Sequence, residues 1–99
     1  MSDNRSVPAV HPREVLREEY LEPLKLSAGK LAKALGVPRT RIERLASEQT
    51  GMTPDTALRL GRYFKTTPQF WLNLQANHDL SVAVGQLDLD AIEPLQAGG

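Results

Sequence analysis

The stretch "ALGVPRTRIERLA" (residues 34–46) places a glycine and a proline between two apolar segments and follows them with three arginines in six residues. Gly36 is suited to the left-handed position that ends a helix, because glycine has no Cβ to clash there. Pro38 cannot prolong that helix but is compatible with the start of the next one. Two helices joined at a steep angle by such a short turn form a helix-turn-helix. The stretch therefore predicts this corner, with the arginines on its second helix.

Residues around the turn also meet the packing demands of the corner. Ala32 lies where the two helices are expected to cross, and a larger side chain there would push them apart. Apolar side chains for the wedge between the helices come from Val37, Ile42 and Leu45. The full set assigned to the corner is Leu31, Ala32, Gly36, Val37, Ile42 and Leu45. These residues are needed to form the corner, whatever it binds.

The rest of the chain is typical of an all-α domain with five helices. The first helix is expected from Pro12 to about residue 21, because Pro23 disfavours helical backbone at the residue before it. Ser27 is the predicted N-cap of the second helix, and the third runs over about 39–48. Thr-Pro pairs at 53–54 and 67–68 open the fourth and fifth helices. After residue 80 the apolar residues have no sustained period, so a continuing helix, a short strand and an ordered tail all stay open.

Helical spacing predicts which side chains face the core. They are Val15, Leu16, Tyr20, Leu24, Leu31, Ala32, Leu35, Ile42, Leu45, Ala46, Ala57, Leu58, Gly61, Phe64, Phe70, Trp71 and Leu74. His11 is expected at the entry to the first helix and His78 on the polar side of the fifth. Neither histidine has cysteine or carboxylate companions at metal-ligand spacing, and no nucleophile-base-acid set is indicated. We therefore expect no metal, no cofactor and no enzymatic activity.

Length and composition limit the class of protein. With 99 residues the chain has room for one ordinary domain, and with no cysteine it has neither a disulfide framework nor thiolate metal ligands. No segment has the roughly 20 apolar residues needed to cross a bilayer, so we expect a soluble intracellular protein. The predicted organisation is a flexible arm over 1–10, the helix-turn-helix domain over 11–80 and a C-terminal segment over 81–99 whose end is disordered.

A net charge of zero conceals an asymmetry along the chain. Residues 25–65 hold nine basic and three acidic residues, whereas residues 66–99 hold four acidic residues and no basic one. A basic middle suits the phosphates of double-stranded DNA, and an acidic end suits a basic protein. The acidic residues of the first helix and of the C-terminal segment can steer a basic partner or simply keep the protein soluble, and both alternatives stay open.

The outer face of the third helix carries the candidate DNA contacts. Arginine can donate two hydrogen bonds to guanine, and basic side chains neutralise phosphates. Base contacts are assigned to Arg39, Thr40, Glu43, Arg44 and Ser47, and phosphate contacts to Lys30, Lys33 and Arg41. Glu43 has two alternative roles, since it can accept from a cytosine amino group or orient a neighbouring arginine.

Two segments of the chain together resemble the HigA-type antitoxins, a branch of the phage-repressor-like (XRE) helix-turn-helix family. They are "HPREVLREEYLEPLKLSAGKLAKALGVPRTRIERL" and "MTPDTALRLGRYFKTTPQFWLNLQANHDL", which cover about residues 11–80. The "LREEYLEPL" and "TPQFWLNLQANHDL" motifs are close to diagnostic. The resemblance implies a homodimer that binds a palindromic operator in its own promoter, represses its operon at the bacterial nucleoid, and neutralises a small basic HigB-like toxin. That toxin is implied to be a ribosome-dependent mRNA endonuclease of the RelE-like fold.

Three positions depart from the pattern of these repressors. Ala28 and Gly29 follow the N-cap of the second helix where a glutamine that contacts DNA is common, so Lys30 is left to substitute for it. Pro38 replaces the usual Ser or Thr cap of the third helix, which removes a side-chain acceptor. Arg13 stands where glycine is common. The first two departures bear on the operator sequence and on the affinity for it.

The C-terminal segment is expected to serve in dimerisation or in toxin contact. Its apolar residues, which a 99-residue monomer has little core left to bury, are Val82, Val84, Leu87, Leu89 and Ile92. A two-fold dimer through the fifth helix and this segment would place two recognition helices roughly 34 Å apart, one turn of DNA. Two other functions stay open: a solitary repressor without a toxin, and a protein-interaction module with a vestigial helix-turn-helix.

Overall fold

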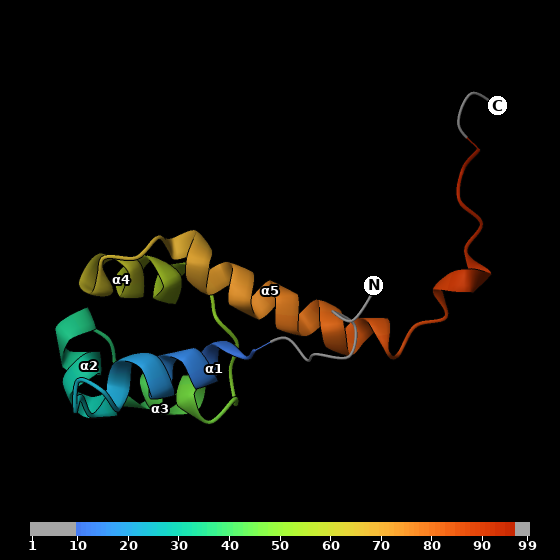
Figure 1. The fold of residues 1–99 in the computed structure, drawn as a ribbon. Coiled ribbons are helices and arrows are strands. Elements are labelled where there is room, and N and C mark those ends of the chain that lie inside the picture. Colours follow the sequence, from blue (N-terminus) through green and yellow to red (C-terminus); the bar gives the residue numbers. More distant parts are fainter. Residues whose placement is uncertain (1–9, 97–99) are drawn as a thin grey trace.

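The computed structural model describes residues 10–96, which fold into helices joined by short loops (Figure 1). The helices are α1 (Pro12–Val15), continued by the π-helix η2 (Leu16–Leu21), α2 (Ala28–Leu35), α3 (Arg39–Ala46), α4 (Pro54–Phe64), α5 (Pro68–Val84) and the short 3-10 helix η3 (Leu89–Ala91). Because the described residues contain no strand, the predicted all-α class is confirmed. The predicted N-terminal arm, apart from Val10, lies outside the described residues.

Side-chain caps begin the helices at the predicted positions. Ser27, Thr53 and Thr67 each accept a hydrogen bond from the backbone N–H three residues later, at 3.1, 3.4 and 3.1 Å. Gly36 ends α2 with a φ of 73°, in the left-handed conformation that its lack of a Cβ permits. These features pair or terminate backbone groups that are otherwise left without partners at helix ends.

The first helix has the predicted ends but a different internal geometry. It begins at Pro12 and widens into η2, where the N–H of Glu22 donates to the carbonyl of Arg17 at 2.9 Å. Such a bond spans one residue more than the bonds of an α-helix do. The helix ends before Pro23, so Leu24 lies beyond its apolar stripe and is exposed. The prediction that Leu24 faces the core is therefore wrong, because it extended the helical period past the end of the helix.

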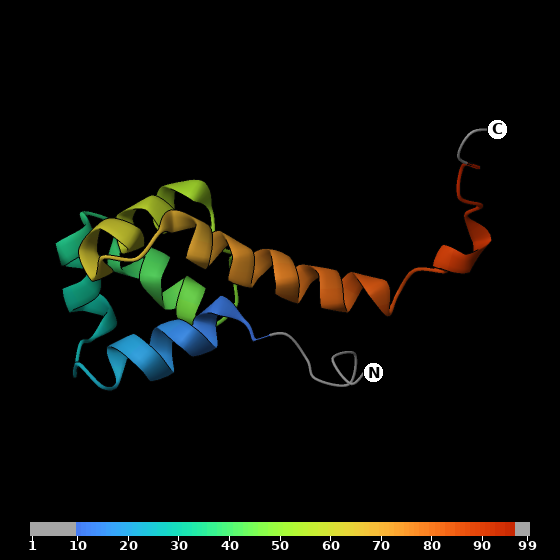
Figure 2. The same ribbon diagram turned by 45° about the horizontal axis from the view of Figure 1, so that its top comes forward.

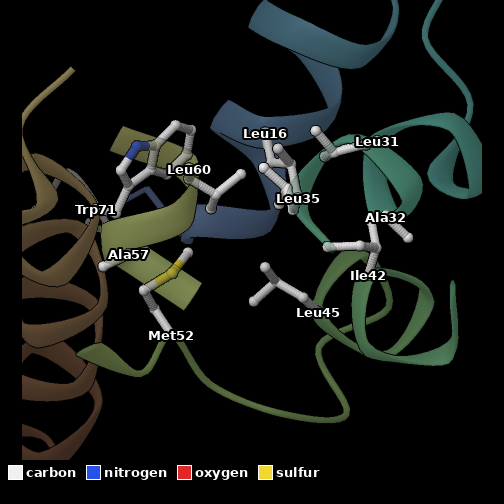
Figure 3. Close-up of a cluster of buried hydrophobic side chains, with 10 residues drawn as sticks. All are labelled: Leu16, Leu31, Ala32, Leu35, Ile42, Leu45, Met52, Ala57, Leu60 and Trp71. Carbon is white, nitrogen blue, oxygen red and sulfur yellow. The ribbon is translucent and has the colours of Figure 1, made fainter. Parts of the chain in front are cut away.

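The hydrophobic core lies where the helices converge, and Figure 3 shows its ten buried side chains. They are Leu16, Leu31, Ala32, Leu35, Ile42, Leu45, Met52, Ala57, Leu60 and Trp71. The indole N–H of Trp71 donates to Thr66 Oγ1 at 2.8 Å, which satisfies the one polar group of this buried side chain. Tyr20 packs against the rings of Phe64 and Trp71 at centroid distances of 4.4 and 5.3 Å. Aromatic contacts thus join the first helix to α4 and α5.

Two residues predicted for the core lie at the surface instead. Leu58 is 60% exposed and Phe70 is 37% exposed. The buried positions of α4 are Thr56, Ala57, Leu60 and Gly61, and Leu58 lies beside this stripe. In α5 only Trp71 is fully buried, and the preceding Phe70 is rotated by about 100° around the helix axis. Its ring packs edge-on against Trp71 with the centroids 5.0 Å apart.

Gly61 allows a close crossing of α4 and the start of α5. A Cβ built on Gly61 would lie 2.8 Å from the carbonyl oxygen of Thr66 and 3.2 Å from the nitrogen of Pro68. Both neighbours are backbone atoms, which cannot turn aside as a flexible side chain does. The predicted inward place of this glycine is confirmed, and its small size is required there.

His11 lies where α1, α5 and the end of α3 meet. Its Nδ1 caps α1 by accepting a hydrogen bond from the N–H of Arg13 at 3.0 Å. The ring of His78, expected on the polar side of the fifth helix, meets it edge-on with the centroids 4.6 Å apart and is partly buried. Glu48 pairs with Arg13 and lies 3.8 Å from His11 Nε2. Burial is the main cause that lowers the pKa of His11, although the carboxylate of Glu48 opposes it.

The C-terminal segment leaves the helical body. Of the three alternatives left open after residue 80, the structure shows the continuing helix as far as Val84. Figures 1 and 2 show α5 running out of the body and the residues after it continuing further away. Beyond α5 only η3 is regular within the described residues, and Leu87 and Ile92 are exposed. No helix in residues 10–96 is long and apolar enough to span a membrane.

Candidate nucleic-acid interface

The corner between α2 and α3 is built as predicted. Leu31 and Ile42 are fully buried, and Ala32 and Leu45 nearly so, while Val37 is partly buried against the core. The N–H of Val37 donates to the carbonyl of Ala32 at 3.0 Å, which closes the turn after Gly36. The corner therefore holds α3 with its opposite face turned to solvent.

Arg59 of α4 braces this corner from the side. One guanidinium nitrogen donates to the carbonyl of Leu35 at 2.7 Å, and Nε donates to Asp55 Oδ1 at 2.7 Å. The carbonyl of Leu35 is one of the last of α2, so the arginine pairs a group that the helix leaves open. Sequence reasoning missed this residue, and its only signal was the spacing of four residues between Asp55 and Arg59 on one helix.

The exposed face of α3 carries all five residues assigned to base contacts. Arg39, Thr40, Glu43, Arg44 and Ser47 are exposed together. Arg39 Nε lies 3.1 Å from Glu43 Oε2, so these two side chains form an ion pair on the exposed face of α3. Arg44 makes no ion pair with any residue of the described range and is free to meet a ligand.

Ser47 and Gly29 make local contacts at the two ends of the exposed α3 face. Ser47 closes the C-terminal end of α3, where its hydroxyl donates to the carbonyl of Arg44 at 3.3 Å. A Cβ on Gly29 would lie 3.2 Å from Cδ of Arg39, so the stem of that arginine rests on the start of α2. A side chain larger than glycine at this position would compete with Arg39 for this space.

Arg41, a predicted phosphate contact, is paired with a carboxylate of α4. One of its guanidinium nitrogens lies 2.7 Å from Asp55 Oδ1, the same oxygen that Arg59 contacts. Hydrogen bonds from Arg59, and then from Arg41, lower the pKa of the Asp55 carboxyl. Two guanidinium groups share one carboxylate, so the local charge stays positive. Lys30 and Lys33, the other two predicted phosphate contacts, are exposed on α2.

A hollow of about 470 Å³ lies between α3 and the start of α4. Its lining includes Thr40, Arg41, Arg44, Thr50, Thr53 and Asp55. Hydroxyl and guanidinium groups are the donors that hold phosphate oxygens in protein–DNA contacts. Thr50 and Gly51, also at the hollow, were missed as candidates, because the loop before α4 has no pattern that shows which side it faces.

Pro38 begins α3 without a side-chain cap. Its φ of −64° and ψ of 146° are those of an extended N-cap, and its carbonyl accepts from the N–H of Arg41 at 3.0 Å. The first N–H groups of α3 therefore have no side-chain acceptor from this residue, which leaves the helix start open to an anion. Within residues 10–96 no group of three or more His, Asp and Glu residues is placed to hold a metal ion.

Comparison with known proteins agrees with this geometry. A helix-turn-helix family model matches residues 18–71. Virulence-associated protein I of Dichelobacter nodosus is 57% identical over 77 residues, which are 78% of this chain and 71% of that protein. The structure of Pseudomonas aeruginosa antitoxin HigA with the higBA promoter superposes with a TM-score of 0.82 at 42% identity, covering 89% of this chain and 99% of that one.

A second solved structure gives the same result. An addiction module antidote protein of the HigA family from Coxiella burnetii has a TM-score of 0.82 and 39% identity, covering 90% of this chain and all of that one (100%). These relatives are an antitoxin and an antidote protein, which confirms the expectation that the chain is not an enzyme. The chain belongs to the HigA antitoxin family of helix-turn-helix proteins.

Proposed function

We propose that the protein is an autoregulatory antitoxin, which represses its own operon from a palindromic operator and neutralises a RelE-like toxin. The observation that carries the proposal is the exposed face of α3, which presents Arg39 and Arg44 to solvent. Beside this face lies the hollow whose hydroxyl and guanidinium groups can donate hydrogen bonds to phosphate. A relative at 42% identity was solved with promoter DNA, which supports promoter binding by this chain.

In this proposal each residue role is assigned from the position of its side chain. Arg39, oriented by Glu43, and Arg44 read base edges in the major groove, with Thr40 between them. Ser47 lies at the far end of α3, so its base contact is the one furthest from the helix start. Lys30, Lys33 and Arg41 meet phosphates on either side of the groove. The domain over 11–80 thus supplies the DNA contacts.

The remaining residues serve assembly. In this proposal two copies pair through α5 and the segment over 81–99, since Val82, Val84 and Leu87 are exposed there. A homodimer presents two recognition helices to the two halves of a palindrome. The acidic residues of the first helix and of the C-terminal segment attract the small basic HigB-like toxin. The site of action is the bacterial cytoplasm, at the operator on the nucleoid.

The test is a binding titration of the purified protein with the DNA upstream of its own gene. Binding should fall steeply as the salt concentration rises from roughly 50 to 200 mM, because phosphate contacts release counterions. Arg39→Ala and Arg44→Ala should each weaken binding by about 1–3 kcal/mol. Arg17→Ala, on the first helix and outside the residues assigned to DNA contact, is the matched control and should leave binding unchanged.

A second measurement separates repression from neutralisation. The adjoining gene should encode a basic protein of about 90–110 residues, the length of a single small domain. Coexpression with the antitoxin should relieve growth arrest caused by that protein. DNA binding without such a gene would identify a solitary repressor instead, and partner binding without any DNA shift would identify a protein-interaction module. Either outcome would contradict the proposal.

A further inference from the structure

A second hollow, which the DNA face does not use, lies between the end of α2 and α4. It has a volume of about 420 Å³ and is lined by Ala34, Leu35, Leu58, Arg59, Arg62 and Tyr63. We call it the α2–α4 groove. Leu58 is 60% exposed and Tyr63 is 44% exposed, so two large apolar side chains of the groove face solvent. Unlike the hollow beside α3, the groove combines an apolar lining with two arginines.

The charge of the groove selects an acidic occupant. Arg59 is engaged with Asp55, but Arg62 makes no ion pair within the described residues. A basic toxin would meet like charge at this rim, and like charges placed across an interface oppose binding. The groove is therefore suited to a segment that combines apolar and acidic side chains.

The chain itself carries such a segment in residues 86–95. Its exposed apolar residues are Leu87, Leu89, Ile92 and Leu95, and its acidic residues are Asp88, Asp90 and Glu93. If two of these segments met each other, three carboxylates would face three carboxylates. Packing of the segment into the groove instead pairs acidic with basic groups and covers Leu58 and Tyr63.

The segment and the groove lie at opposite ends of the same molecule. Residue 85 is separated from the start of α5 by 17 helical residues, about 25 Å. Figures 1 and 2 show the segment continuing away from α4 and not back toward it. If two copies pair with their α5 helices antiparallel, each segment comes beside the α4 of the other copy.

From this placement we infer that the C-terminal segment of one copy docks in the α2–α4 groove of a second copy, and that the exchange is reciprocal. The inference rests on the homodimer of the proposed function and names the surface that accepts its C-terminal segment. It assigns to Arg62 the role of pairing with the Asp88 and Asp90 side chains of the second copy.

Disulfide trapping tests the docking directly, because the chain has no cysteine of its own. Protein carrying L58C is mixed with protein carrying L89C under mild oxidation, and a covalent dimer of the two is expected. E18C, at an exposed site of the first helix, replaces L58C as the control and should give no such product. If the double variant L58C/L89C closes the bond within one chain, the segment docks on its own molecule and the inference is overturned.

Charge reversal supplies an independent measurement. R62E, and separately D88K/D90K, should each weaken dimerisation by about tenfold in sedimentation velocity, and combining them should recover most of the loss. If the dimerisation affinity is unaffected by these changes and no mixed disulfide forms, the docking is refuted while the homodimer is not. A chain that stays monomeric while it binds operator DNA would refute the homodimer and the docking together.

Discussion

Replacing Gly61 with alanine tests how closely α4 and α5 cross. Alanine is favoured over glycine within a helix by about 1 kcal/mol, so propensity alone predicts a more stable protein. In the structure, however, the added Cβ would lie 2.8 Å from the carbonyl oxygen of Thr66 and 3.2 Å from the nitrogen of Pro68. Overpacking of this kind costs about 1–3 kcal/mol. Because both neighbours are backbone atoms, the cost lies in the upper part of this range, and we expect a net loss of about 1–2 kcal/mol, which lowers Tm by roughly 4–16 °C in a domain of this size.

The assay is thermal and urea unfolding followed by circular dichroism, with Gly85→Ala as the matched control. A Cβ on Gly85 meets only the carbonyl oxygen of Val82, at an ordinary contact distance of 3.6 Å. This control should change stability by less than about 0.5 kcal/mol. If Gly61→Ala is as stable as the parent protein, the helix crossing has room for a methyl group and the predicted clash is absent. Equal losses in the free energy of unfolding for both variants would also contradict the prediction.

Three further predictions concern His11, Thr66 and Arg44. Because burial lowers the pKa of His11 below its usual 6.5, the neutral ring stabilises the fold above that pH and the contribution is lost as the pH falls through the lowered pKa. Tm should therefore drop more between pH 7.5 and 5 in the parent protein than in His11→Asn. The asparagine keeps a capping acceptor but does not titrate, and equal drops in Tm would contradict this prediction. Thr66→Val leaves the Trp71 indole without its acceptor and should cost about 1–3 kcal/mol in urea unfolding, whereas Thr50→Val at the surface should cost little. Arg44→Ala should lower the affinity in fluorescence anisotropy and relax the discrimination between bases, with little change in salt dependence, because Arg44 is assigned to a base edge; an unchanged affinity would remove Arg44 from the interface.

The parts of the fold that depend on local chemistry could be predicted from the sequence. Gly36 ends α2 because only a residue without a Cβ adopts its backbone conformation easily. Threonines before Pro54 and Pro68 open helices because their hydroxyls accept from the first free N–H groups. These signals lie within four residues of the structure they determine, so one sequence is enough to recognise them.

The parts that depend on distant contacts could not be predicted. Leu58 has the same apolar character as Leu60, and only the position of the neighbouring helices decides which of the two is buried. The widening of the first helix at η2 has no sequence signal of its own. The same holds for the candidate site. The exposed residues of α3 were identified from their spacing, whereas the hydrogen bond from Arg41 to Asp55 joins residues 14 apart in different helices.

Arg59 belongs to two surfaces that are otherwise separate. It lines the α2–α4 groove, and through Asp55 it is joined to Arg41 at the edge of the DNA face. An acidic group in the groove and a phosphate at Arg41 would each draw one arginine away from the same carboxylate. Occupation of either surface thus changes the electrostatic environment of the other. Because such linkage is reciprocal, the affinity for DNA and the affinity between copies are expected to depend on each other even where no residue contacts both partners.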